Sequence, residues 1–330
     1  MMARGNAGRS GGAARVGGRR ATLSPGAGAP GLGYREPMPP SPPSSQRVLS
    51  PPPASARFLT LRLVDDADAQ DALRALAAQP DPSAVVGIGA PLAARAGRAV
   101  PGLSPFPGDL APLMPASQGE LWLALLHDDR GDQLDASLRF TELLGGAFAV
   151  TDEIDCFTYR GGRDLSGFVD GTANPVGDDA VAAALIAGRG PGLDGGSFVS
   201  VQRWVHDLAA LQSMPEGARD HVIGRRLADD EELADAPASA HVKRTAQEEF
   251  DPEAFVVRRS MPWGDAREHG LVFVAYGESL ERFTRLARRM VGRDDGIVDA
   301  LFSFSRAVSG GMYFCPPVLD GRLDLRALGL

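Results

Sequence analysis

Residues 161–175, in the middle of the chain, constrain its fold more than any other segment. Their sequence is GGRDLSGFVDGTANP, and its glycines and final proline would interrupt a helix or a central strand. The segment is therefore predicted to be a loop. Phe168 and Val169 are apolar, so this loop should pack against the rest of the protein and carry Asp170 with it. Two interpretations remain open: a tight Asp-Gly turn in a connector, or a carboxylate placed over a ligand by a backbone that glycine lets approach closely.

The region before this loop predicts a compact sheet with helices. Alternating apolar residues indicate strands, and apolar residues at helical spacing indicate helices, in the order β-α-β-β-α-β. This order is typical of a ferredoxin-like sandwich, an antiparallel sheet with helices on one face. The expected strands span residues 59–63, 83–90, 121–126 and 150–159, and the expected helices span residues 65–79 and 132–144, the second with Leu134, Leu138 and Leu144 on one side.

After the loop, strands and helices alternate again. We therefore expect an α+β protein with one domain at residues 54–160 and a second at residues 161–330. The expected strands of the second domain span residues 198–205, 255–258, 271–276 and 312–314, and its expected helices span residues 208–223 (broken near Pro215), 280–290 and 297–308.

The composition argues against several classes of protein. Residues 1–53 are rich in Gly, Pro and Arg and poor in aliphatic residues, so they are predicted to form a disordered tail. The chain has 330 residues and a net charge of −8, and because the tail is basic the remainder is strongly acidic, which argues against a nucleic-acid partner. No apolar run approaches the roughly 20 residues needed to span a membrane.

Two features bear on location. Arg19 and Arg20 resemble the start of a twin-arginine export signal, but no apolar stretch follows them. Cys156 and Cys315 are the only cysteines, and their spacing fits neither a disulfide framework nor a zinc site. Free thiols suit a reducing compartment, so a cytoplasmic location is expected.

Six segments occur in an order found in a known family. They are GFVDGTANP at residues 167–175, GGSFVSVQRW at 195–204, VIGR at 222–225, SAHV at 239–242, RRSMPWG at 258–264 and HGL at 269–271. The chain thereby resembles the dye-decolourising peroxidases, a haem family, and is most similar to their shorter bacterial B-type subclass. The resemblance extends from about residue 55 to the C-terminus. It implies two ferredoxin-like domains, with one haem b per chain held mainly by the second.

The resemblance makes His241 the proximal ligand of the haem iron. A proximal imidazole would leave the other face of the iron open to peroxide. Such a histidine normally donates its second ring N–H to an acceptor, which orients the ring. Asp299 is the candidate acceptor, and the alternative of a solvated helix acid remains open.

The resemblance also points to Asp170 and Arg258 as catalytic residues. Cleavage of peroxide needs one group that moves a proton between its oxygens and another that stabilises developing charge. Asp170 suits the first role and Arg258 the second. Adjacent strand residues face opposite sides, so only one of Arg258 and Arg259 can enter a pocket, and the family pattern selects Arg258. The alternative, that both are surface charges on an edge strand, remains open.

Three further residues are expected at the haem. Arg225 would pair with a propionate, although Arg226 beside it is an equally plausible surface charge. Asn174 would line the pocket through its loop. Ser260 would share the face of Arg258, and some family members carry asparagine there, so the division of labour between Asp170 and Arg258 stays open.

These expectations combine into a haem peroxidase that uses hydrogen peroxide to oxidise organic donors in one-electron steps through an oxoferryl intermediate. A carboxylate base with an ordinary pKa of about 4 predicts an acidic activity optimum. Two alternatives are a haem-binding or haem-trafficking protein of the same fold, with incidental peroxidase activity, and a non-haem structural module. A homo-oligomer is expected, because ferredoxin-like sheets often pair through their edges and faces.

Overall fold

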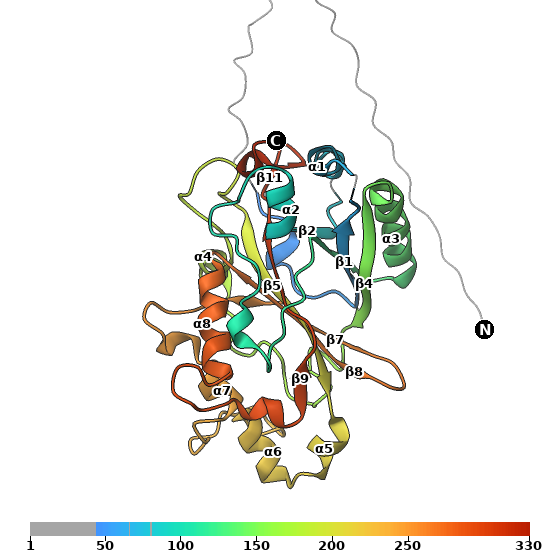
Figure 1. The fold of residues 1–330 in the computed structure, drawn as a ribbon. Helices are drawn as coiled ribbons and strands as arrows, with labels where there is room; N and C mark the ends of the chain where they lie inside the picture. The colour runs from blue at the N-terminus through green and yellow to red at the C-terminus, as the bar shows by residue number, and fades with distance from the viewer. Residues whose placement is uncertain (1–43, 66, 80) are drawn as a thin grey trace, which may run out of the picture. The chain divides into compact units, whose positions relative to one another are not determined.

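Four antiparallel strands in the order β4-β1-β3-β2 make up the first half of the fold (Figure 1). β1 (Ser55–Leu63) lies between β3 (Leu121–His127) and β4 (Phe148–Phe157), and β2 (Ala84–Gly89) pairs with the other side of β3. The computed structural model describes residues 44–65, 67–79 and 81–330. All four strands predicted before residue 160 are present.

The second half continues the same sheet. Its central strand, β5 (Ser197–His206), pairs with β8, β9 and β10, and β8 in turn pairs with β6 and β7. β10 also pairs with β2, and Cys156 of β4 pairs with Trp263 of β7, so the two halves share one ten-stranded sheet. This antiparallel sheet with its helices confirms the α+β class, whereas two ferredoxin-like domains stay a prediction. The remaining strands are β6 (Val257–Arg258), β7 (Met261–Gly264), β8 (His269–Gly277), β9 (Ser305–Ala307) and β10 (Gly311–Cys315).

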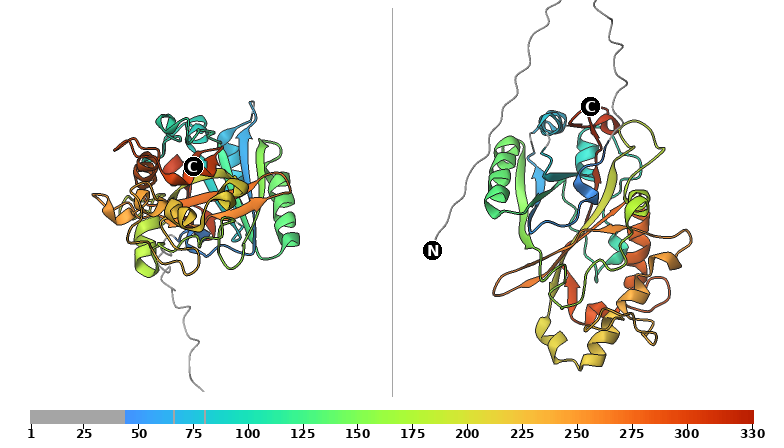
Figure 2. Two further views of the ribbon diagram at one scale, coloured as in Figure 1. Left: turned by 90° about the horizontal axis from the view of Figure 1, so that it is seen from below. Right: turned by 180° about the vertical axis from the view of Figure 1, so that it is seen from behind.

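Helices lie beside the strands of both halves. α3 (Arg130–Leu144) packs against β1 and β3, α1 (Ala69–Ala78) packs against α3, and α8 (Leu280–Met290) packs against β5 and β8 (Figures 1 and 2). The carboxylates of Asp68 and Asp129 cap α1 and α3 by accepting backbone N–H groups of the first turn. The other helices are α2 (Ala90–Arg95), α4 (Gly177–Ala184), α5 (Leu208–Ser213), α6 (Glu216–Ile223) and α7 (His241–Arg244). The 3-10 segments are η1 (Arg47–Leu49), η2 (Gly108–Leu110), η3 (Gln247–Glu249), η4 (Ala300–Ser303) and η5 (Arg326–Leu328), and a short pair joins β11 (Val318–Leu319) to β12 (Arg322–Leu323).

α3 buries a different face from the one predicted. Of the three leucines predicted to share one side, Leu134 and Leu138 are 48% and 60% exposed, whereas Leu144 is buried together with Gln133 and Phe140. The hydroxyl of Ser55 in β1 donates to the side-chain oxygen of Gln133 at 2.9 Å, so a polar residue takes a position expected for leucine. The apolar spacing could not show this, because both faces of the helix carry apolar residues.

The helix predicted at residues 297–308 is wrong. Asp299 caps the short segment η4 by accepting the N–H of Leu301 at 2.8 Å. The chain then turns into β9, where Ser305 pairs with His206 of β5. The apolar residues that suggested one helix are therefore divided between a turn and a strand. α2, α4 and β7 are short elements that the sequence patterns do not predict.

Residues 44–53, predicted as part of a disordered tail, lie against the sheet instead. The side chain of Gln46 holds both backbone groups of Val86 in β2: the Val86 N–H donates to Oε1 at 2.7 Å, and Nε2 donates to the Val86 carbonyl at 3.1 Å. The guanidinium of Arg259 donates to the carbonyls of Leu49 and Ser50, both at 2.7 Å. The rest of the predicted tail, residues 1–43, lies outside the described residues.

The two cysteines follow the prediction. Cys156 and Cys315 are both buried and free. Burial raises the pKa of each thiol, so both stay protonated near neutral pH. In the described part of the chain, no helix has the length and apolarity needed to cross a bilayer.

Two substitutions on α3 test which face is buried. Phe140 is 5% exposed, so Phe140→Ala should lower the free energy of unfolding by about 3–5 kcal/mol. Leu138→Lys should change it by no more than about 0.5 kcal/mol, because the side chain already lies in solvent. Urea denaturation followed by circular dichroism measures both changes. If Leu138→Lys lowered the free energy of unfolding more than Phe140→Ala does, the buried face of α3 would be the one predicted from the sequence.

Candidate active site

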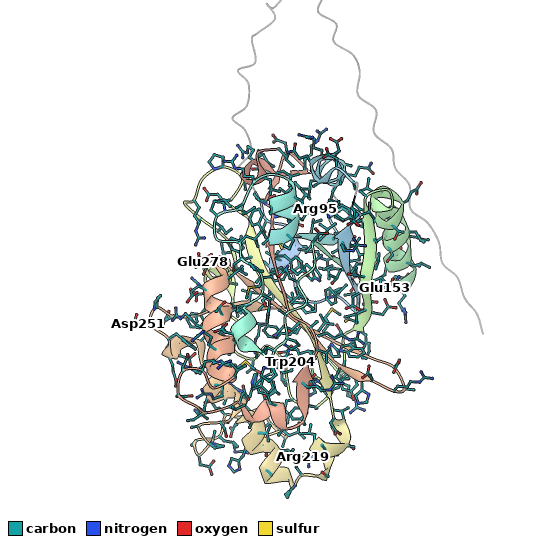
Figure 3. The ribbon with its side chains drawn as sticks, in the orientation of Figure 1. Arg95, Glu153, Trp204, Arg219, Asp251 and Glu278 are labelled. Carbon is teal, nitrogen blue, oxygen red and sulfur yellow. The ribbon has the colours of Figure 1, made fainter. Side chains whose placement is uncertain are left out.

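A cavity lies between β5 and β8 on one side and α7, α8 and η4 on the other. Its sheet wall is built from alternate residues, which face the same side of a strand. Its helix wall is built from residues of α8 at helical spacing. Figure 3 labels Trp204, which belongs to the sheet wall and packs against Phe302, with their ring centroids 5.5 Å apart. The apolar lining includes Phe168, Val169, Trp204, Ile223, Val242, Val256, Leu271, Phe273, Phe283, Leu286, Met290, Leu301 and Phe304.

The segment that begins at Gly161 forms a small hairpin that delivers Asp170 to this cavity. Arg163 and Val169 form a β-bridge. At the tip, the N–H of Gly167 donates to the carbonyl of Asp164 at 2.9 Å, and Gly167 has a φ of +95°, which glycine adopts without strain. Phe168 is buried in a cluster with residues of α5, α6 and η4. The packing predicted for this loop is therefore present, and it fixes the residue that follows.

Burial dominates the electrostatics of Asp170. Desolvation raises the pKa of its carboxyl above the usual value, and the nearby guanidinium of Arg258 acts in the opposite direction. The charge of Asp164 raises the pKa of Asp170 further, because two like charges repel each other. The site thus holds a carboxylate that binds a proton more tightly than an exposed aspartate does.

Asn174 holds the backbone of Arg258 with both ends of its amide. The N–H of Arg258 donates to Oδ1 at 2.8 Å, and Nδ2 donates to the carbonyl of Arg258 at 3.1 Å. The N–H of Asn174 donates to the carbonyl of Gly171 at 2.9 Å, so the turn after Asp170 is closed on the same residue. One short segment therefore carries Asp170 and also fixes the position of Arg258.

Arg258 and Arg259 lie in different surroundings, as neighbours on a strand should. Arg258 lines the cavity, and its buried Nε has no hydrogen-bond partner among the described residues. Arg259 binds the carbonyls of Leu49 and Ser50 instead, and burial lowers the pKa of its guanidinium. Of the two, Arg258 is the cation available to a guest in the cavity.

His241 begins α7 and lines the helix wall. Its Nδ1 lies 2.8 Å from Oδ2 of Asp299, whose side chain is 0% exposed. The contact expected between these two residues is therefore present, although Asp299 caps a 3-10 segment and does not lie within a helix. With Nδ1 held by a carboxylate, Nε2 is the ring nitrogen left for a ligand in the cavity.

Gly224 allows α6 to end against the segment that carries His241. It has a φ of +91°, and a Cβ there would lie 2.4 Å from Cγ2 of Val242. Arg225 follows directly and lines the cavity. Its guanidinium donates to the carbonyl of Asp230 at 2.9 Å and lies 3.4 Å from Oε2 of Glu232.

Two of the residues predicted to contact a cofactor lie outside the cavity lining. Asn174 is engaged with Arg258, as described above. Ser260 is buried in the sheet, where its hydroxyl oxygen accepts the N–H of Val274 at 3.3 Å. In this structure both side chains bind backbone groups of the sheet that carries Arg258.

The polar residues that line the cavity and that the sequence reasoning missed include Asp164, Gln202, His206 and Ser305. Gln202 and His206 share the cavity face of β5 with Trp204, because alternate residues of a strand point the same way. That period was the available signal for both. Asp164 lies in the same glycine-rich segment as Asp170. The sequence offers no signal that would bring Ser305 to them.

The lining fits a haem. Nε2 of Gln202 and Nε of Arg258 are buried donors without partners among the described residues. A buried donor without an acceptor costs about 1–3 kcal/mol, so such a cavity favours a guest that brings acceptors. Nε2 of His241 suits iron, the apolar walls suit a flat macrocycle, and Arg225 suits a carboxylate at its edge.

Comparisons with known proteins point the same way. Residues 161–320 match the family described as "Dyp-type peroxidase, C-terminal". A dye-decolorizing peroxidase of Mycobacterium tuberculosis is 34% identical over 298 residues, which cover 83% of this chain and 89% of that protein. One of Mycolicibacterium paratuberculosis is 36% identical over 227 residues, which cover 65% of this chain and 63% of that relative, less than two thirds of its length. A variant of DypB from Rhodococcus jostii RHA1, in complex with haem, is 31% identical and superposes with a TM-score of 0.73 over 83% of this chain and 96% of that one.

The likeness is not confined to the second half of the fold. The family match begins at residue 161, whereas the alignment with the Mycobacterium tuberculosis protein covers 83% of the chain and so extends into the first half. The cavity residues from Asp164 to Ser305 all fall within the matched range. The chain therefore belongs to the Dyp-type peroxidase family.

Proposed function

We propose that this protein is a haem peroxidase that uses hydrogen peroxide to oxidise organic donors. One observation carries the proposal: a histidine held by a buried carboxylate lines the same apolar cavity as Asp170 and Arg258. The comparisons support peroxidase activity over a haem carrier, because the matched relatives are named as peroxidases. When bound, haem supplies a redox-active iron that exchanges electrons with peroxide and with the organic donor.

When haem is bound, His241 would hold its iron through Nε2. Asp299 accepts a hydrogen bond from Nδ1, which fixes the ring orientation and makes the imidazole more electron-rich. Arg225 would bind a haem propionate, because its planar guanidinium matches a carboxylate. Asn174 and Ser260 act on the cofactor indirectly, because both bind backbone groups around Arg258 and β8.

Asp170 and Arg258 act on peroxide. With haem bound, the carboxylate of Asp170 would take the proton from one peroxide oxygen and return it to the other, which would leave as water, while the haem would supply the two electrons and retain the remaining oxygen atom. Arg258 stabilises the negative charge that develops as the oxygen–oxygen bond breaks. The apolar walls exclude bulk water, so this charge interacts strongly with the guanidinium.

The finer features of the fold and setting are proposed as well. The strand order β4-β1-β3-β2 with α1 and α3 supports a ferredoxin-like first half, and β5, β8 and α8 support a second. The edge strands β6 and β9 of the ten-stranded sheet support a homo-oligomer formed through a sheet edge. The free thiols of Cys156 and Cys315 support a cytoplasmic location.

The visible spectrum of the protein supplied with haem tests the ligand. The parent should show an intense Soret band, and His241→Ala should lose or shift it, because the iron loses its protein ligand. His221→Ala is the matched control, since His221 lies on α6 with a side chain 44% exposed. The same spectrum in parent and His241→Ala would exclude His241 as the ligand, and no haem uptake by the parent would exclude the function.

Asp170→Asn should separate activity from stability. The kcat/KM for peroxide should fall by about 10²–10⁴-fold, because the proton acceptor is lost. In the parent, kcat/KM should fall as the pH is lowered through the raised pKa of Asp170. Stopped-flow kinetics across a pH series measures both effects, and an acid limb that persists unchanged in Asp170→Asn would assign it to another group.

The same variant should raise the melting temperature of the haem-free protein at pH 7. The folded pKa of Asp170 lies above its unfolded value of about 3.9, so the stability contributed by its proton is present below that value and is lost as pH rises through the folded pKa. Asparagine cannot ionise, so Asp170→Asn avoids the loss of stability that the parent undergoes when its carboxyl becomes charged. Calorimetry at pH 4 and pH 7 measures it, and equal stabilisation at both values would contradict the raised pKa.

Asn174→Ala should lower both stability and peroxide turnover. It removes two hydrogen bonds from the Arg258 backbone, which are worth about 0.5–1.5 kcal/mol each, and leaves a partly buried N–H without its acceptor. Gln46→Ala is the matched control, because Gln46 holds Val86 by the same pair of contacts far from the cavity. Both variants should unfold at lower urea concentration, but only Asn174→Ala should lower kcat/KM for peroxide. If both variants lost the same activity, the effect of Asn174 on turnover would be explained by its contribution to stability alone.

A further inference from the structure

A chain of polar contacts crosses the cavity wall where β5 meets β9. Nδ1 of His206 lies 2.7 Å from Oγ of Ser305, its cross-strand partner. Nε2 of His206 lies 3.1 Å from Oδ1 of Asp164, at the tip of the hairpin that carries Asp170. The side chains of His206 and Asp164 are 5% and 14% exposed. The roles proposed above for the catalytic residues use none of these three side chains.

Asp164 organises the tip of that hairpin. Its Oδ2 accepts the N–H of Ser166 at 2.8 Å and also the hydroxyl of Ser166. Its own N–H donates to the carbonyl of Phe168 at 2.9 Å, and its carbonyl accepts from Gly167. One carboxylate therefore joins the turn to the sheet. The other end of the same hairpin leads to Asp170, whose N–H donates to the carbonyl of Gly162 at 3.1 Å.

We propose that His206, acting through Asp164, is a positioning residue for Asp170. The imidazole fixes the Asp164 carboxylate, the carboxylate closes the turn, and the turn sets the place from which Asp170 reaches peroxide. This inference rests on the proposed function, which assigns proton transfer to Asp170. Small displacements matter in such a site, because a shift of about 1 Å in a reacting group costs about 10²-fold in rate.

His206 and Asp164 also affect the charge around Asp170. The groups that face its carboxyl are Arg258 from β6, His241 from α7 and Asp164 from its own hairpin. Arg258 favours the ionised form, as does His241 while no iron is bound, and Asp164 opposes it. Burial raises the pKa of Asp164, but its contacts with His206 and Ser166 outweigh burial and lower the pKa below its usual value, so the opposing charge is present at neutral pH. Removing the Asp164 charge should therefore lower the pKa of Asp170.

A purely structural role for His206 predicts something different. A buried histidine with two partners also stabilises the meeting of β5, β9 and the hairpin. His127 supplies the comparison, because its Nε2 contacts Oγ of Ser83 at 2.9 Å outside the cavity lining. Substitution of either histidine lowers stability on this view, and neither substitution changes the pH dependence of catalysis.

Kinetic variants distinguish the two views. His206→Leu should lower kcat/KM for peroxide by about 10²-fold, His206→Gln should restore part of it by donating to Asp164, and His127→Leu should leave it unchanged. Asp164→Asn, which keeps the shape of the side chain, should move the acid limb of kcat/KM to lower pH. Ser305→Ala should also lower kcat/KM for peroxide, but by less than His206→Leu. This variant tests the proposal even if His206→Leu fails to fold. An unmoved acid limb in Asp164→Asn, or equal losses from the two histidine variants, would overturn the proposal.

A second measurement needs no haem. In the haem-free protein, the stabilisation produced by Asp170→Asn at pH 7 should be smaller in the Asp164→Asn background, because one source of repulsion is already gone. Calorimetry of the parent, the two single variants and the double variant gives this coupling. Additive effects would show that Asp164 does not act on Asp170. If the parent fails to turn over peroxide while the coupling is present, the proposed function fails and the electrostatic coupling between Asp164 and Asp170 stands.

Discussion

The paired hydrogen bonds between the Asn174 amide and the backbone of Arg258 are the contact on which the site depends. A two-residue strand such as β6 has little pairing of its own, so the direction of the Arg258 side chain needs another support. The amide supplies the donor and acceptor that a neighbouring strand would supply. Since Asn174 follows Asp170 within one turn, the carboxylate and the guanidinium are set relative to each other by local chain geometry.

The cavity joins two kinds of wall with different tasks. The helix wall contributes His241, held by a carboxylate that is itself tied into a capped turn. The sheet wall contributes Arg258 and carries Gln202, whose amide nitrogen is a buried donor without a partner among the described residues. Each wall thus leaves specific polar atoms for a guest, in surroundings where a polar atom without a partner is costly. The apolar residues between them provide the volume and exclude water.

Much of this site could be predicted from the sequence because its chemistry lies in short segments that resemble those of a known family. Asp170, His241 and Arg258 were found from such segments, and all three line the cavity. The contact between His206 and Asp164 could not be found that way, because it joins segments that only the folded sheet brings together. The face of α3 was mispredicted for a related reason: Gln133 is buried by its bond to Ser55, and hydrophobic periodicity does not register such bonds.

Arg259 gives the first described residues of the chain a role that their composition hides. Its guanidinium lies outside the cavity lining and donates hydrogen bonds to the carbonyls of Leu49 and Ser50. A segment some two hundred residues upstream in sequence thereby supports the strand that presents Arg258 to the cavity. A protease that cut the chain between Ser50 and Ser55 would cut none of the residues that line the cavity. It would still weaken the support of Arg259 and thereby loosen Arg258, its neighbour in the cavity.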